Sequence, residues 1–180
     1  DADVSVTGWF VMALATAQMV GLTINEKKLQ SVNDYLDSVA SHELSAYAYK
    51  ERHGPDLTMT AEALLCRILL GWPRTHPALR RGVAELVRNV PDQSAPIHSV
   101  YYWYYATQVL HHYGSDEWEL WNAHMKKSLP AMQITVGPEK GSWGPQRDMY
   151  GRVGGRLYTT CLSIYCLEVY YRHLAVYGVD

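Results

Sequence analysis

Helical segments of two kinds alternate along the chain, and this alternation is the feature that most constrains the fold. Four segments are apolar on nearly all sides, which is typical of buried helices; they cover residues 3–21, 56–71, 97–114 and 156–174. Three segments between them are apolar on one face only, at the spacing of an amphipathic helix; they cover residues 25–40, 77–90 and 115–133. No segment alternates as a strand would. The pattern predicts an all-α fold of about seven helices, with an inner and an outer layer.

Several helix starts are marked by capping residues. Asp3 and Asp56 are the first residues of two apolar segments, Asn25 is the first of an amphipathic one, and Ser115 or Asp116 is expected to cap another. Side chains of these types accept backbone N–H groups that a helix start leaves unpaired. The apolar segments also begin alike, which aligns Thr7, Thr60, Ser99 and Thr160 with one another. Their uneven spacing predicts helix pairs joined by loops of different length, and residues 134–155 are expected to form the longest loop.

Composition excludes some classes of function. The net charge is −2 and the sequence pI is about 6.5, so no basic surface is predicted for nucleic acid. No apolar stretch is long enough to span a membrane. The chain contains 14 Tyr and 6 Trp but a single Phe. Tyr and Trp join an apolar ring to a polar tip, which suits the wall of a cavity or an interface better than a dry core.

Length and termini predict one domain, residues 1–180. Because Asp1 lies directly before a helix and no initiator Met precedes it, we expect a part of a longer chain. Three cysteines cannot all pair with one another, and five helical positions place the Cα atoms of Cys161 and Cys166 about 8 Å apart. We therefore expect buried free thiols.

Two further motifs resemble a known superfamily. Residues 129–133, Leu-Pro-Ala-Met-Gln, followed by Gly141-Ser142-Trp143 resemble the Gln-Trp repeat of squalene cyclases, in which a Gln at a helix end and a Gly-x-Trp in the next loop tie neighbouring repeats together. Residues 158–161 resemble an inner-helix start in the β subunits of protein prenyltransferases. The resemblance, to the superfamily with the prenyltransferase and squalene oxidase repeat, implies an α/α toroid of inner and outer helix pairs. Seven helices would make a partial or open barrel, from the C-terminal region of a longer chain or excised from one.

The catalytic positions of this superfamily are replaced. Aligned through Thr7, the acid that protonates the substrate of squalene–hopene cyclases falls on Ser5, whose hydroxyl is too weak an acid for that step. The zinc ligands of protein prenyltransferases fall on Ile97, Ser99 and Thr159, none of which fits a zinc site. The Cys-Gly-Glu-Gln stretch of the thioester relatives is absent. We therefore expect no catalytic residue, no metal and no cofactor.

The resemblance leaves aromatic residues as the candidates for binding. A non-catalytic module is expected to bind a protein partner or an apolar, isoprenoid-like molecule on a concave aromatic face. The alternatives are a divergent isoprenoid cyclase or prenyltransferase-like enzyme with catalytic groups elsewhere in a longer chain, and a carbohydrate-handling protein. Homo-oligomers and contacts with the remainder of a longer chain are compatible with each. The predicted ligand-binding residues are Trp9, Tyr101, Tyr102, Tyr105, Trp143, Asp148, Tyr158 and Tyr165.

Overall fold

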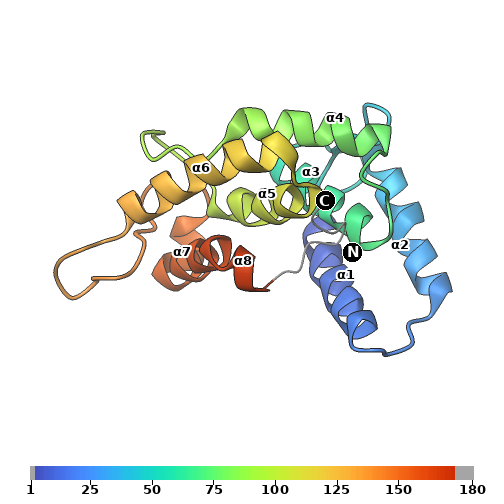
Figure 1. Cartoon of the computed structure of the whole chain (residues 1–180), viewed down its shortest axis with the longest axis horizontal. Coiled ribbons are helices and arrows are strands. Elements are labelled where there is room, and N and C mark those ends of the chain that lie inside the picture. The colour runs from blue at the N-terminus through green and yellow to red at the C-terminus, as the bar shows by residue number, and fades with distance from the viewer. Residues whose placement is uncertain (1–2, 173–180) are drawn as a thin grey trace. The chain divides into compact units, whose positions relative to one another are not determined.

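The structure is a computed structural model that describes residues 3–172, and it is predominantly helical, as the sequence predicts (Figure 1). The chain divides into two compact units, residues 1–86 and 87–180. Each unit contains helices of both predicted kinds. The last part of the fourth apolar segment, including Leu174, lies outside the described residues.

Unit 1 contains four helices and a small hairpin. The elements are α1 (Val4–Met19), α2 (Glu26–Ser38), β1 (Ala40–Ser41), β2 (Ala46–Tyr47), α3 (Leu57–Leu69) and α4 (Pro77–Leu86).

Helix α3 is the centre of unit 1. Its residues from Thr58 to Ile68 are all buried, as predicted for an inner helix. Helix α1 packs along one side of it and α4 along another. Both contacts use a glycine at the closest approach. A Cβ atom on Gly8 of α1 would lie 2.1 Å from Glu62 Oε1, and one on Gly82 of α4 would lie 2.4 Å from Leu64 Cδ1.

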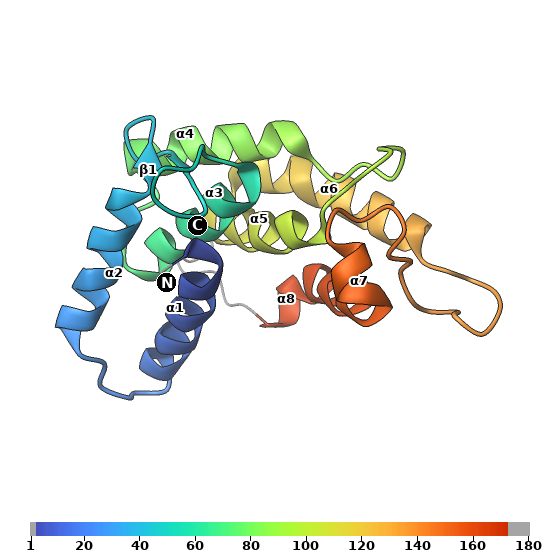
Figure 2. The ribbon, with the colours of Figure 1, turned by 180° about the vertical axis from the view of Figure 1, so that it is seen from behind.

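The hairpin that follows α2 was not predicted (Figure 2). Ala40 pairs with Tyr47 and Ser41 with Ala46 in an antiparallel register. The expectation that the chain has no strands is therefore wrong. Two-residue strands are too short to produce an alternating pattern. The turn between β1 and β2 contains three successive residues, 42–44, with positive φ, which is uncommon for residues other than glycine.

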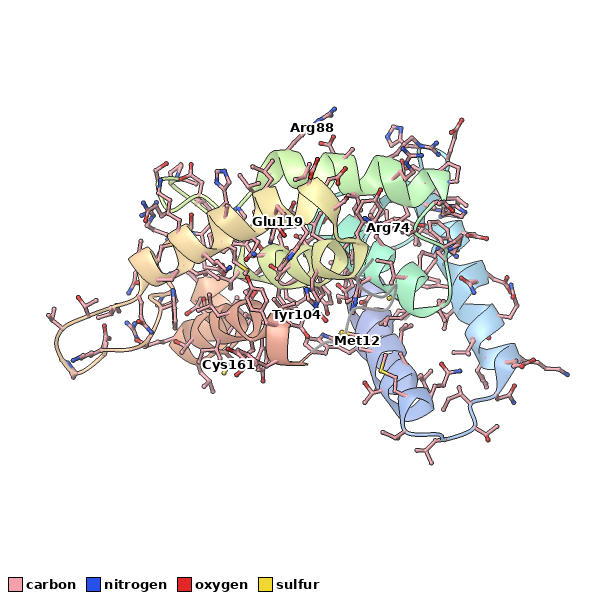
Figure 3. All side chains as sticks on the ribbon, in the orientation of Figure 1. Met12, Arg74, Arg88, Tyr104, Glu119 and Cys161 are labelled. Atoms are coloured by element: carbon pink, nitrogen blue, oxygen red, sulfur yellow. The ribbon has the colours of Figure 1, made fainter. Side chains whose placement is uncertain are left out.

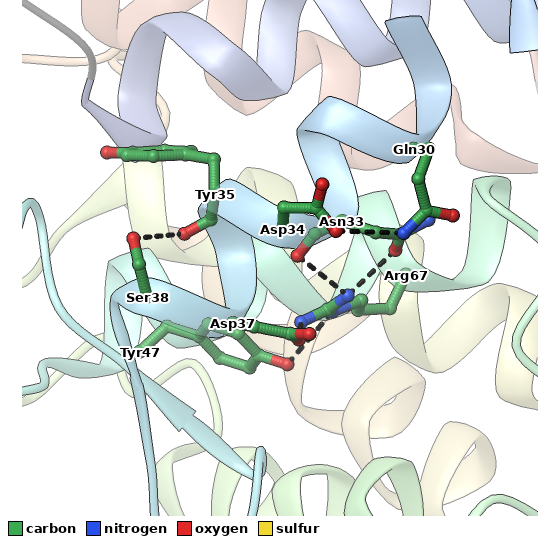
Figure 4. A network of polar contacts seen from close by, with 8 residues as sticks. All are labelled: Gln30, Asn33, Asp34, Tyr35, Asp37, Ser38, Tyr47 and Arg67. Carbon is green, nitrogen blue, oxygen red and sulfur yellow. Dashed lines mark hydrogen bonds and ion pairs between the residues drawn. The ribbon is translucent and has the colours of Figure 1, made fainter. Parts of the chain in front are cut away.

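A buried arginine ties α3 to α2 and to the hairpin (Figure 4). Arg67 is 2% exposed and forms an ion pair with Asp37. Its Nη1 donates to Asn33 Oδ1 at 2.7 Å and its Nε to Tyr47 Oη at 3.2 Å. The guanidinium also lies 4.9 Å from the centre of the Trp72 ring. A buried charge with this many partners is stabilised where it lies.

Unit 2 also contains two long apolar helices with an amphipathic helix between them in the chain. It contains the short 3₁₀ helix η1 (Val87–Asn89), α5 (Val100–Tyr113), α6 (Ser115–Met132), α7 (Gly151–Leu167) and α8 (Val169–Arg172). Helix α5 packs against both α6 and α7 and is buried on nearly all sides, as predicted.

Most predicted caps are confirmed. Asp3 accepts from Val6 N, Asn25 from Lys27 N and Asp56 from Met59 N, each at 2.9 Å. Ser99 also caps its helix, which makes it equivalent to Asp3 and Asp56, and the sequence alignment with Thr7 and Thr60 is wrong.

Glycine precedes α6 and the regular part of α7. Gly114, with φ 72° and ψ −154°, precedes α6, so the expected Ser115 or Asp116 cap is wrong. Gly155 has φ 68° and ψ −171° and interrupts α7, so that regular helix begins at residue 156, the predicted start.

The loop between α6 and α7 is held by the residues of the Gln-Trp motif. Gln133 pairs with Trp143 through the backbone, and Gln133 Nε2 donates to Gly141 O at 3.0 Å. Trp143 Nε1 donates to Leu129 O at 2.7 Å, so its buried ring anchors the loop on the end of α6.

The same hydrogen bond recurs in the two units. In unit 1 the backbone N–H of Tyr47 donates to Thr60 Oγ1 at 3.0 Å, and in unit 2 that of Trp143 donates to Thr160 Oγ1 at 3.1 Å. Each bond joins a buried aromatic residue, placed after an amphipathic helix, to a threonine near the regular start of the next apolar helix. The two units are therefore built on one plan, with α1, α2 and α3 matched by α5, α6 and α7.

Two of the four apolar helices are less buried than predicted. Helix α1 buries one stripe and leaves Val6, Trp9 and Phe10 50%, 46% and 67% exposed. Helix α7 leaves Leu157 78% exposed. All three cysteines are free, as expected, but only Cys66 and Cys166 are buried, whereas Cys161 on α7 is partly exposed.

Candidate functional site

Six tyrosines gather where α5, α7 and the segment before α7 meet. We term this group the tyrosine cluster; its members are Tyr101, Tyr104, Tyr105, Tyr150, Tyr158 and Tyr165. Figure 3 labels Tyr104 on α5, together with Cys161 on α7.

Helix α5 supplies the base of the cluster. Positions 101, 104 and 105 are three and four apart, so they share one face of the helix. The Tyr105 ring lies 5.0 Å from the Tyr101 ring and 4.9 Å from the Tyr104 ring, edge to face in both cases. Tyr104 and Tyr105 are buried, while Tyr101 is half-buried and its hydroxyl oxygen lies 3.4 Å from that of Tyr105. The base is thus a packed aromatic layer with one tyrosine at its edge.

The remaining three tyrosines form a partly exposed rim. Tyr150 lies 6.1 Å from Tyr101, edge to face, and Tyr165 lies 5.9 Å from Tyr104. Burial raises the pKa of Tyr158, and the nearby negative charge of Asp148 raises it further. The Tyr158 hydroxyl therefore stays protonated at neutral pH and remains available as a hydrogen-bond donor.

Asp148 holds the loop against the start of α5. It is 5% exposed, and its Oδ2 accepts from Val100 N at 2.8 Å while its Oδ1 accepts from Tyr150 N at 2.9 Å. A carboxylate at a helix N-terminus is stabilised by the unpaired N–H groups and the helix dipole. Asp148 thus fixes Tyr150 beside Tyr101 and adds a negative charge beneath the cluster.

His98 is buried beside this loop, and its backbone N–H donates to Arg147 O at 3.0 Å. The His98 ring stacks on Trp103 with the ring centres 5.0 Å apart and the planes inclined by 13°. Burial lowers the pKa of His98, although the nearby Asp148 opposes the shift, and Nδ1 has no hydrogen-bond partner among residues 3–172. His98 also lines a cavity of about 330 Å³, together with Gln93, Ala131, Met132, Ile134, Gly144, Gln146 and Arg147.

Unit 1 has a cavity of its own, of about 420 Å³. It lies between the hairpin turn and the facing ends of α3 and α4. Two of its charged lining residues have other contacts: Asp56 caps α3, and Arg81 pairs with Glu43 at 3.0 Å. The remaining lining residues are His42, Ser45, Ala46, Pro55, Leu57, Thr60 and Glu85.

The structure gathers four of the eight predicted ligand-binding residues in the tyrosine cluster. These are Tyr101, Tyr105, Tyr158 and Tyr165. Asp148 lies beneath them.

The other three predicted residues lie elsewhere. Tyr102 lies on another side of α5, about 100° of helix rotation from Tyr101, and packs edge to face on Trp121 of α6, 5.8 Å away. Trp143 is buried in its loop, and Trp9 lies on α1 in unit 1. Ligand contact at these three positions stays a prediction.

Two members of the cluster and one neighbour were missed. Tyr104 could have been found because it lies three positions after Tyr101, on the same face of the helix. Tyr150 and His98 carry no such signal, since only the fold of the loop brings them to α5.

In the described part of the chain, no three His, Cys, Asp or Glu side chains gather closely enough to hold a metal ion. None of the helices within residues 3–172 has the length and apolar character needed to cross a lipid bilayer. No family model, curated protein or solved structure matches the chain.

Proposed function

We propose that this chain is a non-catalytic binding module that holds an apolar ligand or a protein partner on its tyrosine cluster. The observation that carries the proposal is the layering of the cluster. A buried base of rings holds a rim of partly exposed tyrosines in fixed orientations, which lowers the conformational cost of binding. Aromatic rings with hydroxyl tips suit a surface that contacts apolar groups and donates hydrogen bonds.

The surroundings of the cluster support an apolar occupant. Met149 and Tyr150, next to the buried Asp148, are 60% and 42% exposed, and Val153 one turn later is 94% exposed. Contiguous exposed apolar side chains are typical of contact sites for partners or ligands.

The α/α-toroid arrangement is part of this proposal. It is supported inside each unit by the packing of two apolar helices, α1 on α3 and α5 on α7. In the chain, an amphipathic helix separates the two members of each pair. The contacts of Gln133 and Trp143 support it as well, because they tie α6 to the loop before α7.

One observation favours the alternative, a divergent isoprenoid cyclase or prenyltransferase-like enzyme. Glu62 is fully buried in α3, against Gly8 of α1. A buried carboxyl group in an apolar helix is the kind of residue that acts as a general acid in a catalytic site.

Calorimetric titration with farnesyl diphosphate, followed by product analysis, separates the two functions. A binding module binds this ligand and leaves it unchanged, while inorganic diphosphate alone does not bind. Tyr158→Ala is expected to weaken binding by about tenfold, because it removes one ring of the rim. Tyr171→Ala is the matched control, since Tyr171 is 91% exposed on α8 and outside the cluster.

Each other outcome has a definite consequence. A product that forms with the wild type and is lost in Glu62→Gln would favour the enzyme. If farnesyl diphosphate does not bind, or binds equally to the wild type and Tyr158→Ala, an isoprenoid ligand of the tyrosine cluster is ruled out.

A further inference from the structure

We infer that the cavity of about 330 Å³ in unit 2 is a binding site for a small monocarboxylate with an apolar body. His98 and Arg147 hold the carboxylate group, and Met132 and Ile134 contact the apolar body. Among residues 3–172, no member of the tyrosine cluster lines this cavity. The site is therefore separate from the one proposed above and does not depend on it.

Three segments of unit 2 enclose the cavity, and hydrogen bonds connect them. The segments are the one before α5, the end of α6 with the residues that follow it, and the loop before α7. Arg147 of the loop donates through Nη2 to the backbone carbonyls of Gln93 and Ala95. The backbone N–H of His98 donates to Arg147 O at 3.0 Å, and its carbonyl accepts from Met149 N at 2.8 Å. Walls that are already connected lower the cost of ordering the site when a ligand binds.

The ring of His98 supplies one hydrogen-bond donor. The residue is 8% exposed, and stacking on Trp103 fixes the plane of its ring. Burial lowers the pKa of His98, so the ring is neutral at pH 7. Its Nδ1 is buried without a partner among the described residues. Because buried N–H groups without an acceptor are rarer than buried acceptors without a donor, the proton of the neutral ring belongs on Nε2, where it faces an acceptor in the cavity.

Arg147 supplies the positive charge and further donors. Its side chain is exposed, and within the described part of the chain only Nη2 is hydrogen-bonded. The N–H groups of Nε and Nη1 are left for a ligand, and a planar guanidinium matches the two oxygens of a carboxylate. His98 and Arg147 thus present donors, so the group that binds them must be an acceptor.

The charges in and around the cavity select a ligand with a single negative charge. Arg147 is the one charged residue in the lining that the structure describes, since His98 is neutral. Asp148 lies close enough to His98 to affect its pKa, and both of its oxygens accept from backbone N–H groups. Its negative charge opposes a ligand with two or more negative charges, such as inorganic phosphate, because Arg147 alone would balance them.

The opposite wall is apolar and suits a small hydrocarbon body. It consists of Ala131, Met132 and Ile134, at the end of α6 and just beyond it. Met132 and Ile134 are half-buried, and the flexible side chain of a methionine adapts to ligands of different shape. The cavity volume lies at the lower end of the range for ligand pockets, about 300–1,000 Å³, so the ligand is small.

The probe for the test is 3-phenylpropanoate, which joins one carboxylate to a small aromatic body. It is titrated into the intact chain, and the ring nitrogens of ¹⁵N-labelled His98 are followed by NMR. A saturable shift is expected, with a Kd of about 1 mM or lower. The neutral 3-phenylpropanamide has nearly the same shape and is expected to bind about tenfold more weakly, because it lacks the charge that Arg147 pairs with.

Two variants test the residues that hold the carboxylate, with affinity measured from the NMR signals of the probe. His98→Phe keeps a ring against Trp103 but removes the Nε2 donor, and it is expected to weaken binding by about tenfold. His124→Phe, at an exposed position on α6, is its control. Arg147→Gln is expected to weaken binding by about tenfold or more. Arg80→Gln removes the same charge from an exposed position in unit 1 and should change nothing.

A third variant tests the cavity itself. Ala131 is exposed at the end of α6, so Ala131→Trp is expected to fold normally and to fill the space that the probe occupies. Tyr158→Ala should leave binding of the probe unchanged, which separates this site from the tyrosine cluster. Circular dichroism of each variant checks that its helices are intact.

The proposal is overturned if the probe gives no saturable shift, or if the amide binds as tightly as the carboxylate. It is equally overturned if His98→Phe and Arg147→Gln, or Ala131→Trp, bind the probe as tightly as the wild type. The farnesyl diphosphate titration is independent of these outcomes, because it reports on the tyrosine cluster.

Discussion

Two ionisable side chains are buried in α3, and unit 1 accommodates them differently. Arg67 is surrounded by acceptors from α2 and the hairpin, which satisfy its guanidinium group. Glu62 packs against the backbone of α1 at a position where only a glycine fits. Burial of Arg67 depends on its hydrogen-bond acceptors, whereas burial of Glu62 depends on the absence of a side chain at position 8. The stability of unit 1 is therefore expected to respond to different substitutions at the two sites.

Gly8→Ala is expected to destabilise the chain by about 1–3 kcal/mol. Alanine normally stabilises a helix relative to glycine, but here its Cβ would lie 2.1 Å from the Glu62 carboxylate. Urea denaturation measures the change. Gly54→Ala is the control, because no atom lies within 4 Å of its Cβ position and its free energy of unfolding should barely change. Equal values for the two variants would contradict the close packing of α1 on α3.

His98 is expected to make the stability of unit 2 depend on pH. Burial lowers its pKa in the folded chain, so below about 6.5 the unfolded chain binds the proton more readily. The free energy of unfolding should therefore fall as the pH drops from 7 to 5. His98→Phe keeps a ring against Trp103 and should reduce this fall. His124→Phe, at an exposed position on α6, should leave it unchanged, and an unaltered slope in both variants would show that His98 is not responsible.

At the scale of elements, several helix starts are each determined by a single residue. Asp3, Asn25 and Asp56 cap their helices through side chains, and Gly114 and Gly155 begin theirs through backbone conformation. The two glycines have closely similar φ and ψ values, in a region that other residues rarely adopt. At these two starts, which have no side-chain cap, the backbone conformation requires glycine.

Gly155→Ala is expected to destabilise unit 2 by about 1–3 kcal/mol, because φ 68° with ψ −171° is strained for any residue with a Cβ atom. Hydrogen exchange of the α7 amides should rise in the variant. Arg152→Ala, three positions earlier and exposed, serves as the control and should leave both the stability and the exchange rates near those of the wild type. An alanine that is tolerated at position 155 would show that this start of α7 can adopt another conformation.

Periodicity and capping residues were sufficient to predict the seven main helices, since both act within one element. The hairpin at residues 40–47 could not be predicted, because its strands are two residues long and its turn has positive φ at non-glycine positions. Four of the six tyrosines of the tyrosine cluster were predicted from the sequence. Tyr101 and Tyr105 are related by spacing on one helix, whereas Tyr150 reaches them only through the fold of a loop.

At the scale of the whole molecule, the chain contains one plan twice. In each unit an apolar helix, an amphipathic helix, a buried aromatic residue and a second apolar helix follow in order. The uneven lengths of the connections concealed this plan in the sequence, where only the starts of the apolar segments could be aligned. The clearest equivalence is a hydrogen bond, Tyr47 to Thr60 and Trp143 to Thr160, rather than a sequence motif.

Thr60→Val and Thr160→Val are expected to have similar effects, each losing about 1–2 kcal/mol, because each leaves a backbone N–H without its acceptor. The Tyr47 amide should exchange faster in Thr60→Val and the Trp143 amide faster in Thr160→Val. Each variant thus serves as the control for the other. If one substitution were silent, or if both accelerated the same amide, the equivalence of the two units would be lost.

The distribution of tryptophan decides what spectroscopy will report about this chain. Trp9 and Trp72 belong to unit 1, while Trp103, Trp118, Trp121 and Trp143 belong to unit 2. Intrinsic fluorescence excited at the indole band therefore comes mainly from residues 87–180, whereas far-ultraviolet circular dichroism weighs the helices of both halves. A melting curve recorded by tryptophan emission is therefore expected to follow mainly residues 87–180. A difference between its midpoint and the midpoint recorded by circular dichroism would show that the two units unfold independently.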